Sequence, residues 1–446
     1  MRLRNLRISS HHFFGRGGFV LGLMLLAPLW SGGGMAGALE DYVNAPDTAY
    51  HWRYESEAQE PWGTLIRLEL ISQKWRGETW SHGLVIVRPL ELRNPKTAFL
   101  LITHDGAASI DLLKTVAERA GAIAAAITGV PNQPLYGRSE DALVAYTFDR
   151  YAETNDKTWP LLFPMVKSAV RGMDAVQEFV GRTLSVGIEK FLVAGASKRG
   201  WTAWLTAAVD GRVKAIAPMV FDMLNIKTQL QWTEKVYGRQ SEYIHDYTDL
   251  GLHRALDDSP LQRLRVWVDP YAYRERYRMP KLLLLGTNDP YWTVDSLRHY
   301  WHDLPEPKLL FQAPNAGHGA GSTLEARQTL ASFFEMVADN HPLPRLAWTH
   351  TQRGDDTEMI QVKTNAKPTA IRLWTAESSD RDFRNDAWSS RSLALNPERN
   401  GAAILVRAPC DKYRAYLVEV ELRSPSGHPY QLSTEVRVLP DLARIE

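Results

Sequence analysis

The order of apolar and polar residues divides the chain into two regions of different character. From residue 39 to residue 344, short runs that are apolar at nearly every position alternate with stretches of helical periodicity. Strands buried on both faces show such continuous apolar runs, and their alternation with helices predicts a parallel sheet covered by helices. The expected strands are Ala98–Thr103, Ala122–Thr128, Phe191–Ala194, Val213–Phe221, Lys281–Gly286 and Lys308–Gln312, with helices at Leu112–Ala120 and Phe163–Val180 among those between them.

Three earlier segments have a different pattern, in which polar and apolar residues alternate: Thr48–Glu57, Gly63–Gln73 and Thr79–Pro89. This alternation is typical of strands with one solvated face, and it predicts an antiparallel meander that leads into the sheet. At the other end of the region, Ser322 and Glu325 have the spacing of a capping box before an amphipathic run. We therefore expect the last helix of this region to begin at Ser322.

The second region follows Pro342 and Pro344. Its short alternating segments, separated by Pro, Gly, Asn and Ser, are "TEMIQVKT", "TAIRLWTA", "AAILVRAP", "RAYLVEVELRS" and "YQLSTEVRVLP". Short strands at this spacing predict a β-sandwich of about 100 residues. The chain is thus expected to have an α/β domain at residues 39–344 and a C-terminal β-sandwich domain at residues 345–446.

The first 38 residues form a third kind of segment. Four arginines and no acidic residue precede an apolar run of 12 residues from Phe19 to Trp30, and a Gly-rich stretch then ends in Ala36-Gly37-Ala38. This is the layout of a secretory signal with an A-x-A cleavage site. The apolar run is shorter than the roughly 20 residues that cross a bilayer. We predict cleavage before Leu39 and a periplasmic or secreted bacterial protein with no integral membrane segment.

Composition narrows the classes of function. The 446 residues are 44% apolar, and loss of the four leader arginines takes the formal net charge from +1 to −3, which gives no reason to expect a nucleic-acid partner. Cys410 is the single cysteine, so a disulfide within the chain is excluded, and a buried, inert thiol is expected there. Carboxylates and histidines lack metal-ligand spacing, so neither a metal nor another cofactor is expected.

The stretch "FLVAGASKRGW" at residues 191–201 carries the strongest chemical signal. An apolar strand ends at Gly195, Ser197 follows, and the next residues are compatible with a helix. A sharp strand-to-helix turn with small neighbours lifts a serine hydroxyl clear of the sheet, as in a nucleophile elbow. The usual motif has glycine two residues after the serine, whereas here Arg199 holds that position and Gly200 comes one later. An ordinary helix-capping serine is the alternative at this point.

Two later segments favour the nucleophile. "PKLLLLGTNDPYW" presents Asp289 after a strand, and "LLFQAPNAGHG" presents His318 after the next strand. The order Ser, Asp, His, each just past the carboxyl end of a strand, is that of the α/β-hydrolase triad. Serine needs an imidazole base, and the imidazole needs a carboxylate that fixes its tautomer. Ser197, His318 and Asp289 are therefore the predicted catalytic residues, with Asp295 and Asp222 left open as alternative acids.

The loop after the strand Ala98–Thr103 contains His104, but this loop usually supplies an oxyanion donor in such folds. We predict that the backbone N–H groups of Asp105, Gly106 and Lys198 form the oxyanion hole. Lys198 and Arg199 place two cations at a helix N-terminus, where they oppose the helix dipole. Either an internal carboxylate such as Asp222 or an anionic substrate group is expected to compensate them.

Residues 222–280 separate two core strands and are rich in aromatic residues, so we predict a lid-like insertion. Its aromatic residues, together with Trp201 and Trp292, are expected either to line a substrate cleft or to belong to the core. The aromatic residues in question within the insertion are Trp232, Tyr237, Tyr243, Tyr247, Trp267, Tyr271 and Tyr273. Arg199, Trp201 and Trp292 are the predicted substrate-binding residues.

Several long strings in this sequence resemble the PhoPQ-activated pathogenicity-related proteins. They are "GASKRGWTAWLTAAVDGRVKAIAPMVFD", "DPYAYRERYRMPKLLLLGTNDPYWTVDSL", "PNAGHG", "LEDYVNAPDTAYHW" and "LWTAESSDRDFRNDAW". The resemblance covers nearly all of the chain after the leader. It implies an exported bacterial protein with an α/β-hydrolase fold and a C-terminal β domain, in a family whose activity is poorly defined. The elbow alone is also similar to that of the glucuronoyl esterases.

Together these observations predict an exported serine hydrolase, of esterase or peptidase type, that works by acyl transfer on a small-molecule, peptide or glycan ester substrate. Two other functions stay open at this point. One is a binding or signalling protein on a catalytically idle hydrolase scaffold, because fold does not fix function. The other is a carbohydrate esterase whose β domain holds the glycan.

Overall fold

The computed structural model describes residues 37–442 apart from 107–108, 258 and 355. Nearly all of the predicted leader, including its apolar run, lies outside the described residues. Within the described part, none of the helices is both long enough and apolar enough to span a bilayer.

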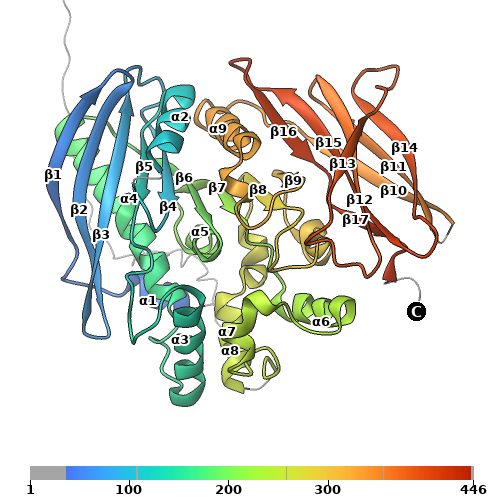
Figure 1. Cartoon of the computed structure of the whole chain (residues 1–446). Helices are drawn as coiled ribbons and strands as arrows, with labels where there is room; N and C mark the ends of the chain where they lie inside the picture. The colour runs from blue at the N-terminus through green and yellow to red at the C-terminus, as the bar shows by residue number, and fades with distance from the viewer. Residues whose placement is uncertain (1–36, 107–108, 258, 355, 443–446) are drawn as a thin grey trace, which may run out of the picture. The chain divides into compact units, whose positions relative to one another are not determined.

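A nine-stranded sheet forms the centre of the fold, with strand order β1-β2-β3-β5-β4-β6-β7-β8-β9 (Figure 1). The first three strands form an antiparallel meander, and β3 pairs antiparallel with β5, whereas all later pairs are parallel. The strands are β1 (His51–Glu60), β2 (Gly63–Trp75), β3 (Glu78–Pro89), β4 (Thr97–Ile102), β5 (Ala124–Ile127), β6 (Lys190–Ala196), β7 (Val213–Met219), β8 (Lys281–Gly286) and β9 (Lys308–Ala313). The chain runs from β4 to β5 and then crosses back to β6 on the other side of β4, so the strand order reverses beside β6. Ligands of such sheets bind at this reversal.

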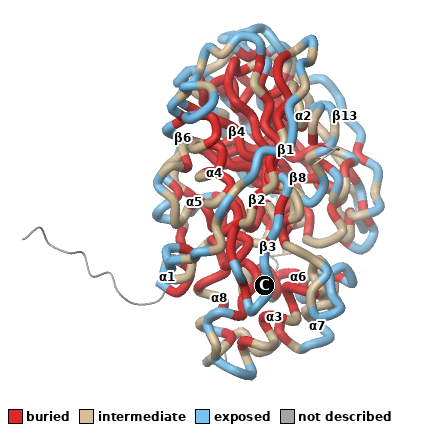
Figure 2. The backbone as a smooth tube through the Cα atoms, turned by 90° about the vertical axis from the view of Figure 1, so that its left-hand side faces the viewer, coloured by how far each residue is buried: buried red, intermediate tan, exposed pale blue. Residues whose placement is uncertain are grey.

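Alternate residues of the parallel strands face two separate cores, which explains their continuous apolar runs. On one face, Leu100 and Val193 pack with α4 (Leu162–Leu184) and α5 (Lys198–Val209). On the other face, Phe99 and Leu192 pack with α2 (Ile110–Ala120) and α9 (Leu324–Ala338). Figure 2 shows β4, β6 and α4 buried inside the molecule. The predicted fold class is therefore confirmed: this is an α/β-hydrolase-like, mostly parallel sheet covered by helices.

The start of α9 differs from the prediction. Ser322 lies in a short 3₁₀ turn, and the helix begins at Leu324 with Thr323 as its cap. The hydroxyl of Thr323 accepts a hydrogen bond from the N–H of Ala326 at 3.2 Å. The predicted capping box of Ser322 and Glu325 is therefore wrong. The cap lies one residue later, because the hydroxyl of Thr323 accepts the hydrogen bond that was expected for Ser322.

The C-terminal region consists of two antiparallel sheets, as predicted, with orders β10-β11-β14 and β13-β12-β15-β16, and with β17 paired to β15. Its strands are β10 (Leu346–Gly354), β11 (Thr357–Thr364), β12 (Ala370–Ser378), β13 (Ser389–Ser392), β14 (Gly401–Arg407), β15 (Tyr413–Arg423), β16 (Pro429–Ser433) and β17 (Arg437–Leu439). Cys410 is exposed in the turn after β14, so the expectation of a buried thiol was wrong.

The C-terminal sheets share a core with the end of the central sheet. Val418 and Leu432 belong to the same buried cluster as Leu330 and Phe334 of α9. A hydrogen bond also crosses this contact, since the backbone N–H of Gln312 in β9 donates to the side-chain hydroxyl of Ser433 at 2.9 Å. The division at residue 344 into two domains stays a prediction.

Residues between β7 and β8 form the predicted insertion. It contains α6 (Ile226–Tyr237), α7 (His245–Thr248) and α8 (Ser259–Val268). The insertion packs against α3 (Glu140–Thr154), which contacts both α7 and α8 (Figure 1). The remaining described helix of the chain's N-terminal part, α1 (Gly37–Asn44), packs on α4.

Candidate active site

Ser197 lies at the turn between β6 and α5, with a backbone conformation that few residues adopt. Its φ of 56° and ψ of −128° belong to neither strand nor helix. The turn is held from both sides: the N–H of Ser197 donates to the carbonyl of Met219 in β7 at 2.9 Å, and its own carbonyl accepts from Trp201 at 2.9 Å. A strained non-glycine residue persists only where its surroundings enforce it, and such strain is a hallmark of the nucleophile elbow.

Two glycines make this turn feasible. A Cβ at Gly195 would lie 2.4 Å from the carbonyl oxygen of Arg199, so a side chain there would prevent the chain from folding back. A Cβ at Gly200 would lie 3.0 Å from the carbonyl oxygens of both Gly195 and Met219. The helix thus comes closest to the sheet at Gly200, the third residue after the serine. This explains why glycine is found at that position and why Arg199 is tolerated one position earlier.

The predicted triad residues come together. Nε2 of His318 lies 2.9 Å from Oγ of Ser197, and Nδ1 of His318 lies 2.8 and 3.0 Å from the two carboxylate oxygens of Asp289. The Asp289 side chain is 3% exposed, and it also accepts a hydrogen bond from the N–H of Tyr291. The ring of Tyr291 stacks on the imidazole, with centroids 4.2 Å apart. With Nδ1–H donating to Asp289, Nε2 is left to accept the serine proton.

The loops that carry Asp289 and His318 are tied to each other. The hydroxyl of Thr287 donates to the side chain of Asn288 and accepts from the N–H of Asn315. The N–H of Asn288 in turn donates to the carbonyl of Ala316 at 3.0 Å. The acid loop and the base loop therefore form one hydrogen-bonded unit at the ends of β8 and β9.

Residues 383–388 of the C-terminal region form hydrogen bonds with this unit. Nδ2 of Asn288 donates to three backbone carbonyls, those of Phe383, Arg384 and Asp386, at 3.1, 3.3 and 2.8 Å. Asn315 makes a two-point contact with the backbone of Trp388, donating at 2.9 Å and accepting at 2.7 Å. Neither asparagine was predicted from the sequence, where the signal for both was only their position beside the predicted acid and base.

Neither alternative acid reaches the imidazole. Asp295 is 2% exposed and pairs with Arg381 of the C-terminal region at 2.8 Å and with Arg298 at 3.1 Å. Burial favours its neutral form, but these two guanidinium groups hold the pKa of Asp295 well below its usual range. Asp222 accepts a hydrogen bond from the hydroxyl of Tyr300 at 2.6 Å. Burial and the charges of neighbouring carboxylates raise the pKa of Asp222 to about 8.

The two cations after the serine are compensated, but not by Asp222. Glu140 at the start of α3 pairs with Nζ of Lys198 at 2.7 Å and with Arg199 at 2.6 Å, and Asp141 lies 3.3 Å from Lys198. Burial would raise the pKa of Glu140, but the two cations lower it to about 2. An internal carboxylate compensates the two cations, which is one of the two expected alternatives, but the residue is Glu140 and not Asp222, because α3 brings a closer pair of carboxylates. Arg199 also donates to the carbonyl of Val130, and its role in substrate binding stays a prediction.

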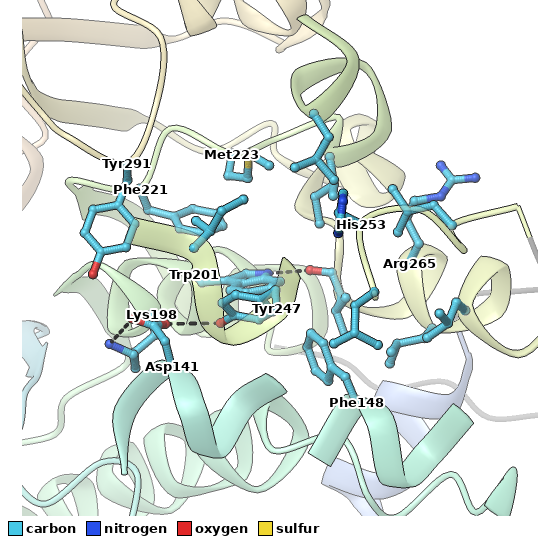
Figure 3. A pocket seen from close by; sticks show the side chains of 18 of the residues that line it. Asp141, Phe148, Lys198, Trp201, Phe221, Met223, Tyr247, His253, Arg265 and Tyr291 are labelled. Atoms are coloured by element: carbon cyan, nitrogen blue, oxygen red, sulfur yellow. Dashed lines mark hydrogen bonds and ion pairs between the residues drawn. The ribbon is translucent and has the colours of Figure 1, made fainter. Parts of the chain in front are cut away.

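Ser197 lines an apolar cavity of about 120 Å³. Figure 3 shows other side chains of its wall. Trp201 and Trp292 line it as predicted, whereas Trp232, Trp267 and Tyr273 of the insertion are buried elsewhere. Leucine, isoleucine, methionine and valine side chains of the insertion form most of the remaining wall: Met223, Ile226, Leu230, Ile244, Leu252, Leu256, Leu261, Leu264 and Val268. The insertion thus covers the site mainly with aliphatic groups.

Ser197 also lines a second, more polar cavity of about 330 Å³. Its lining includes His318 and the predicted oxyanion residue Asp105. Further polar groups around it are Thr103, His104, Ser109, Arg199, Ser322 and Arg327. Gly106 lies against Thr128, where an added Cβ would come within 2.8 Å of the threonine methyl. The oxyanion role of Asp105, Gly106 and Lys198 stays a prediction. In the described residues, no group of three or more His, Cys, Asp or Glu side chains is placed to hold a metal ion.

Comparison with known proteins agrees with the family resemblance. The model of the PhoPQ-activated pathogenicity-related proteins matches residues 39–384. The chain belongs to this family. It is also 34% identical, over 378 residues, to autocrine proliferation repressor protein A of Dictyostelium discoideum, an alignment that covers 78% of this chain and 76% of that protein.

Similar solved structures are esterases of low sequence identity. Acetyl xylan esterase 1 from Thermoanaerobacterium sp. is 15% identical with a TM-score of 0.48, covering 68% of this chain and 91% of the esterase. A glucuronoyl esterase from Solibacter usitatus is 12% identical with a TM-score of 0.41, again covering 68% of this chain and 91% of its own. The family match extends to residue 384 and so includes Phe383 and Arg384, which contact the acid loop.

Proposed function

We propose that this protein is an exported serine hydrolase that cleaves esters by acyl transfer, with Ser197 as nucleophile, His318 as base and Asp289 as the orienting acid. The observation that carries the proposal is the continuous hydrogen-bonded line from Oγ of Ser197 through the imidazole to the buried carboxylate. The strained backbone at Ser197 adds to it, because strain of this kind has no purpose in an ordinary helix cap.

The reaction follows from these positions. Oγ of Ser197 attacks the ester carbonyl while its proton passes to Nε2 of His318, and the backbone N–H groups near Lys198 and Asp105 stabilise the oxyanion. The imidazolium, stabilised by Asp289, then donates its proton to the leaving alkoxide as the ester C–O bond breaks. Water attacks the acyl-enzyme with His318 again as base, which releases the acid and restores the serine.

The test is hydrolysis of a 4-nitrophenyl ester by the parent protein and by Ser197→Ala. We expect kcat/KM to fall by about 10⁴ or more in Ser197→Ala, with an unchanged melting temperature. Ser390→Ala, on the exposed strand β13, is the control and should behave as the parent. Equal rates of ester hydrolysis for Ser197→Ala and the parent would contradict the proposed function.

A second candidate is a signalling or binding protein on an idle hydrolase scaffold. The name of the Dictyostelium relative, a repressor of proliferation, favours it. A folded parent protein that hydrolyses no ester of any acyl chain length would decide for this candidate.

Export belongs to the same proposal. The family match begins at Leu39, the first residue after the predicted leader, and this supports a leader outside the shared part of the family. Protein secreted by a bacterial host should begin at Leu39 within a residue or two by mass spectrometry, and an intact Met1 on exported protein would contradict the leader.

A further inference from the structure

Several polar side chains that line the apolar cavity beside Ser197 are already paired with one another. Lys198 contacts Asp141, and Asp141 accepts a hydrogen bond from the hydroxyl of Tyr247 at 3.1 Å (Figure 3). Deeper in the wall, the indole N–H of Trp201 donates to the carbonyl of Val268. A sugar hydroxyl or a charged group would find few free partners among these side chains, and a buried polar group without a partner is costly. The cavity therefore favours an apolar occupant.

The far end of the cavity sets a limit to the length of that occupant. His253 and Arg265 lie at the end opposite Lys198 and Tyr291 (Figure 3). Nδ1 of His253 and Nε of Arg265 are buried without a hydrogen-bond partner among the described residues. An apolar chain that reached this end could not supply the hydrogen bonds that these two atoms lack, so a chain that stops short of them is preferred.

The volume indicates the size of the group. An apolar cavity of about 150 Å³ in another protein holds one benzene molecule. A cavity volume of about 120 Å³ therefore accommodates a chain of about four to six carbons or a single small ring.

The position of His318 decides which part of an ester enters this cavity. His318 lines the polar cavity and is absent from the lining of the apolar one. Because its Nε2 must protonate the leaving oxygen, the alcohol lies on the polar side, and the acyl chain is left with the apolar side. We propose that the apolar cavity is the acyl-binding site and that the preferred substrates are esters of apolar acids of about four to six carbons with a polar alcohol. This inference rests on the proposed function.

The experiment compares kcat/KM for 4-nitrophenyl acetate, butyrate, hexanoate and decanoate. Each methylene that enters an apolar site raises kcat/KM roughly three- to four-fold, so hexanoate should exceed acetate by on the order of 100-fold. Decanoate should fall below hexanoate, because its chain is longer than a volume of about 120 Å³ accommodates.

Variants at Leu264, which is 3% exposed on α8 and lines the cavity, test the site itself. Leu264→Trp fills the space and should lower the ratio of hexanoate to acetate at least ten-fold. Leu264→Ala enlarges the space and should move the optimum toward longer chains. Val266→Trp, on the same helix but outside the cavity lining, is the matched control and should leave the profile unchanged.

Opposite shifts from two substitutions at one position do not arise from partial unfolding, so the pair supports the proposal even if one variant is less stable. A chain-length profile flat within about three-fold, or ratios unchanged in both Leu264 variants, would overturn the acyl-site proposal alone. Absence of hydrolysis of every ester, together with no fluorophosphonate adduct on Ser197, would overturn the proposed function and this inference with it.

Discussion

The backbone of Ser197 is held by a neighbouring strand and helix, whereas the loops that carry Asp289 and His318 are also held by the C-terminal sheets. The two backbone hydrogen bonds of Ser197 join it to β7 and α5. The acid and base loops instead depend on Asn288 and Asn315, whose partners are the backbone groups of residues 383–388. One half of the site is therefore local to a short stretch of sequence, and the other half requires contacts between residues about 70–100 positions apart.

From this difference we propose that the C-terminal sheets help to position the predicted triad. Their contact with the rest of the chain includes the buried pair of Arg381 and Asp295, so the segment before residue 383 is fixed as well. We expect changes in the triad itself to have the largest effect on catalysis and changes in its outer support to have a smaller one.

The largest effect is expected at His318 and Asp289. His318→Ala should lower ester hydrolysis by about 10⁴, because a serine without its base is barely nucleophilic. Asp289→Asn should cost the same or less, since it disturbs the tautomer and orientation of the imidazole. The double variant should be no worse than His318→Ala, because the residues act as one unit. Steady-state kinetics checks all three, and additive losses would show that the two residues act independently.

An intermediate effect is expected at Asn288, because a change there alters the support of the acid loop and leaves the backbone hydrogen bonds of Ser197 in place. Asn288→Ala removes three hydrogen bonds to the C-terminal region, and misplacement of the acid loop should lower kcat by roughly 10- to 100-fold with KM within two-fold. Asn400→Ala, in a C-terminal loop away from the triad, is the matched control. A kcat for Asn288→Ala equal to that of the parent would mean that the sheet edge holds the acid without outside help.

The smallest effect concerns Asp222, the carboxyl group at the end of β7 that the triad leaves unused. Because burial raises its pKa in the folded state to about 8, folding takes up a proton between pH 4 and pH 8, and stability contributed by the neutral group is lost as pH rises. The parent should lose at most about 1.4 kcal/mol per pH unit through this group. Asp222→Asn should therefore gain stability relative to the parent from pH 5 to pH 8.

Denaturant unfolding across this pH range measures the effect, with the exposed Asp411→Asn as control. Parallel stability curves for the parent and Asp222→Asn would contradict the raised pKa.

The contrast between contacts close in sequence and contacts between distant residues explains which features the sequence predicted. Lys281–Gly286 matches β8 at both ends, because a continuous apolar run identifies a strand buried on both faces. The triad was predictable because each member follows such a strand directly. The meander β1–β3 and the two C-terminal sheets were visible in their alternating residues.

Several failures involve partners from distant segments. Asp222 was the example given of an internal carboxylate for Lys198 and Arg199, but α3, a helix that was not predicted, brings Glu140 to them. Similarly, no periodicity marks Asn288 and Asn315, since their function depends on where residues 383–388 lie. The aromatic residues of the insertion were only partly informative, because burial in the core and lining of a cavity favour the same side chains.

The assignment of Ser197 as the nucleophile is tested by labelling with a fluorophosphonate, followed by peptide mapping. Only a serine activated by its neighbours reacts with this reagent, so the account predicts one adduct, on Ser197, that forms in the parent and is absent from His318→Ala. An adduct on a different serine, or an unlabelled Ser197 in the folded parent, would contradict the assignment of Ser197 as the nucleophile.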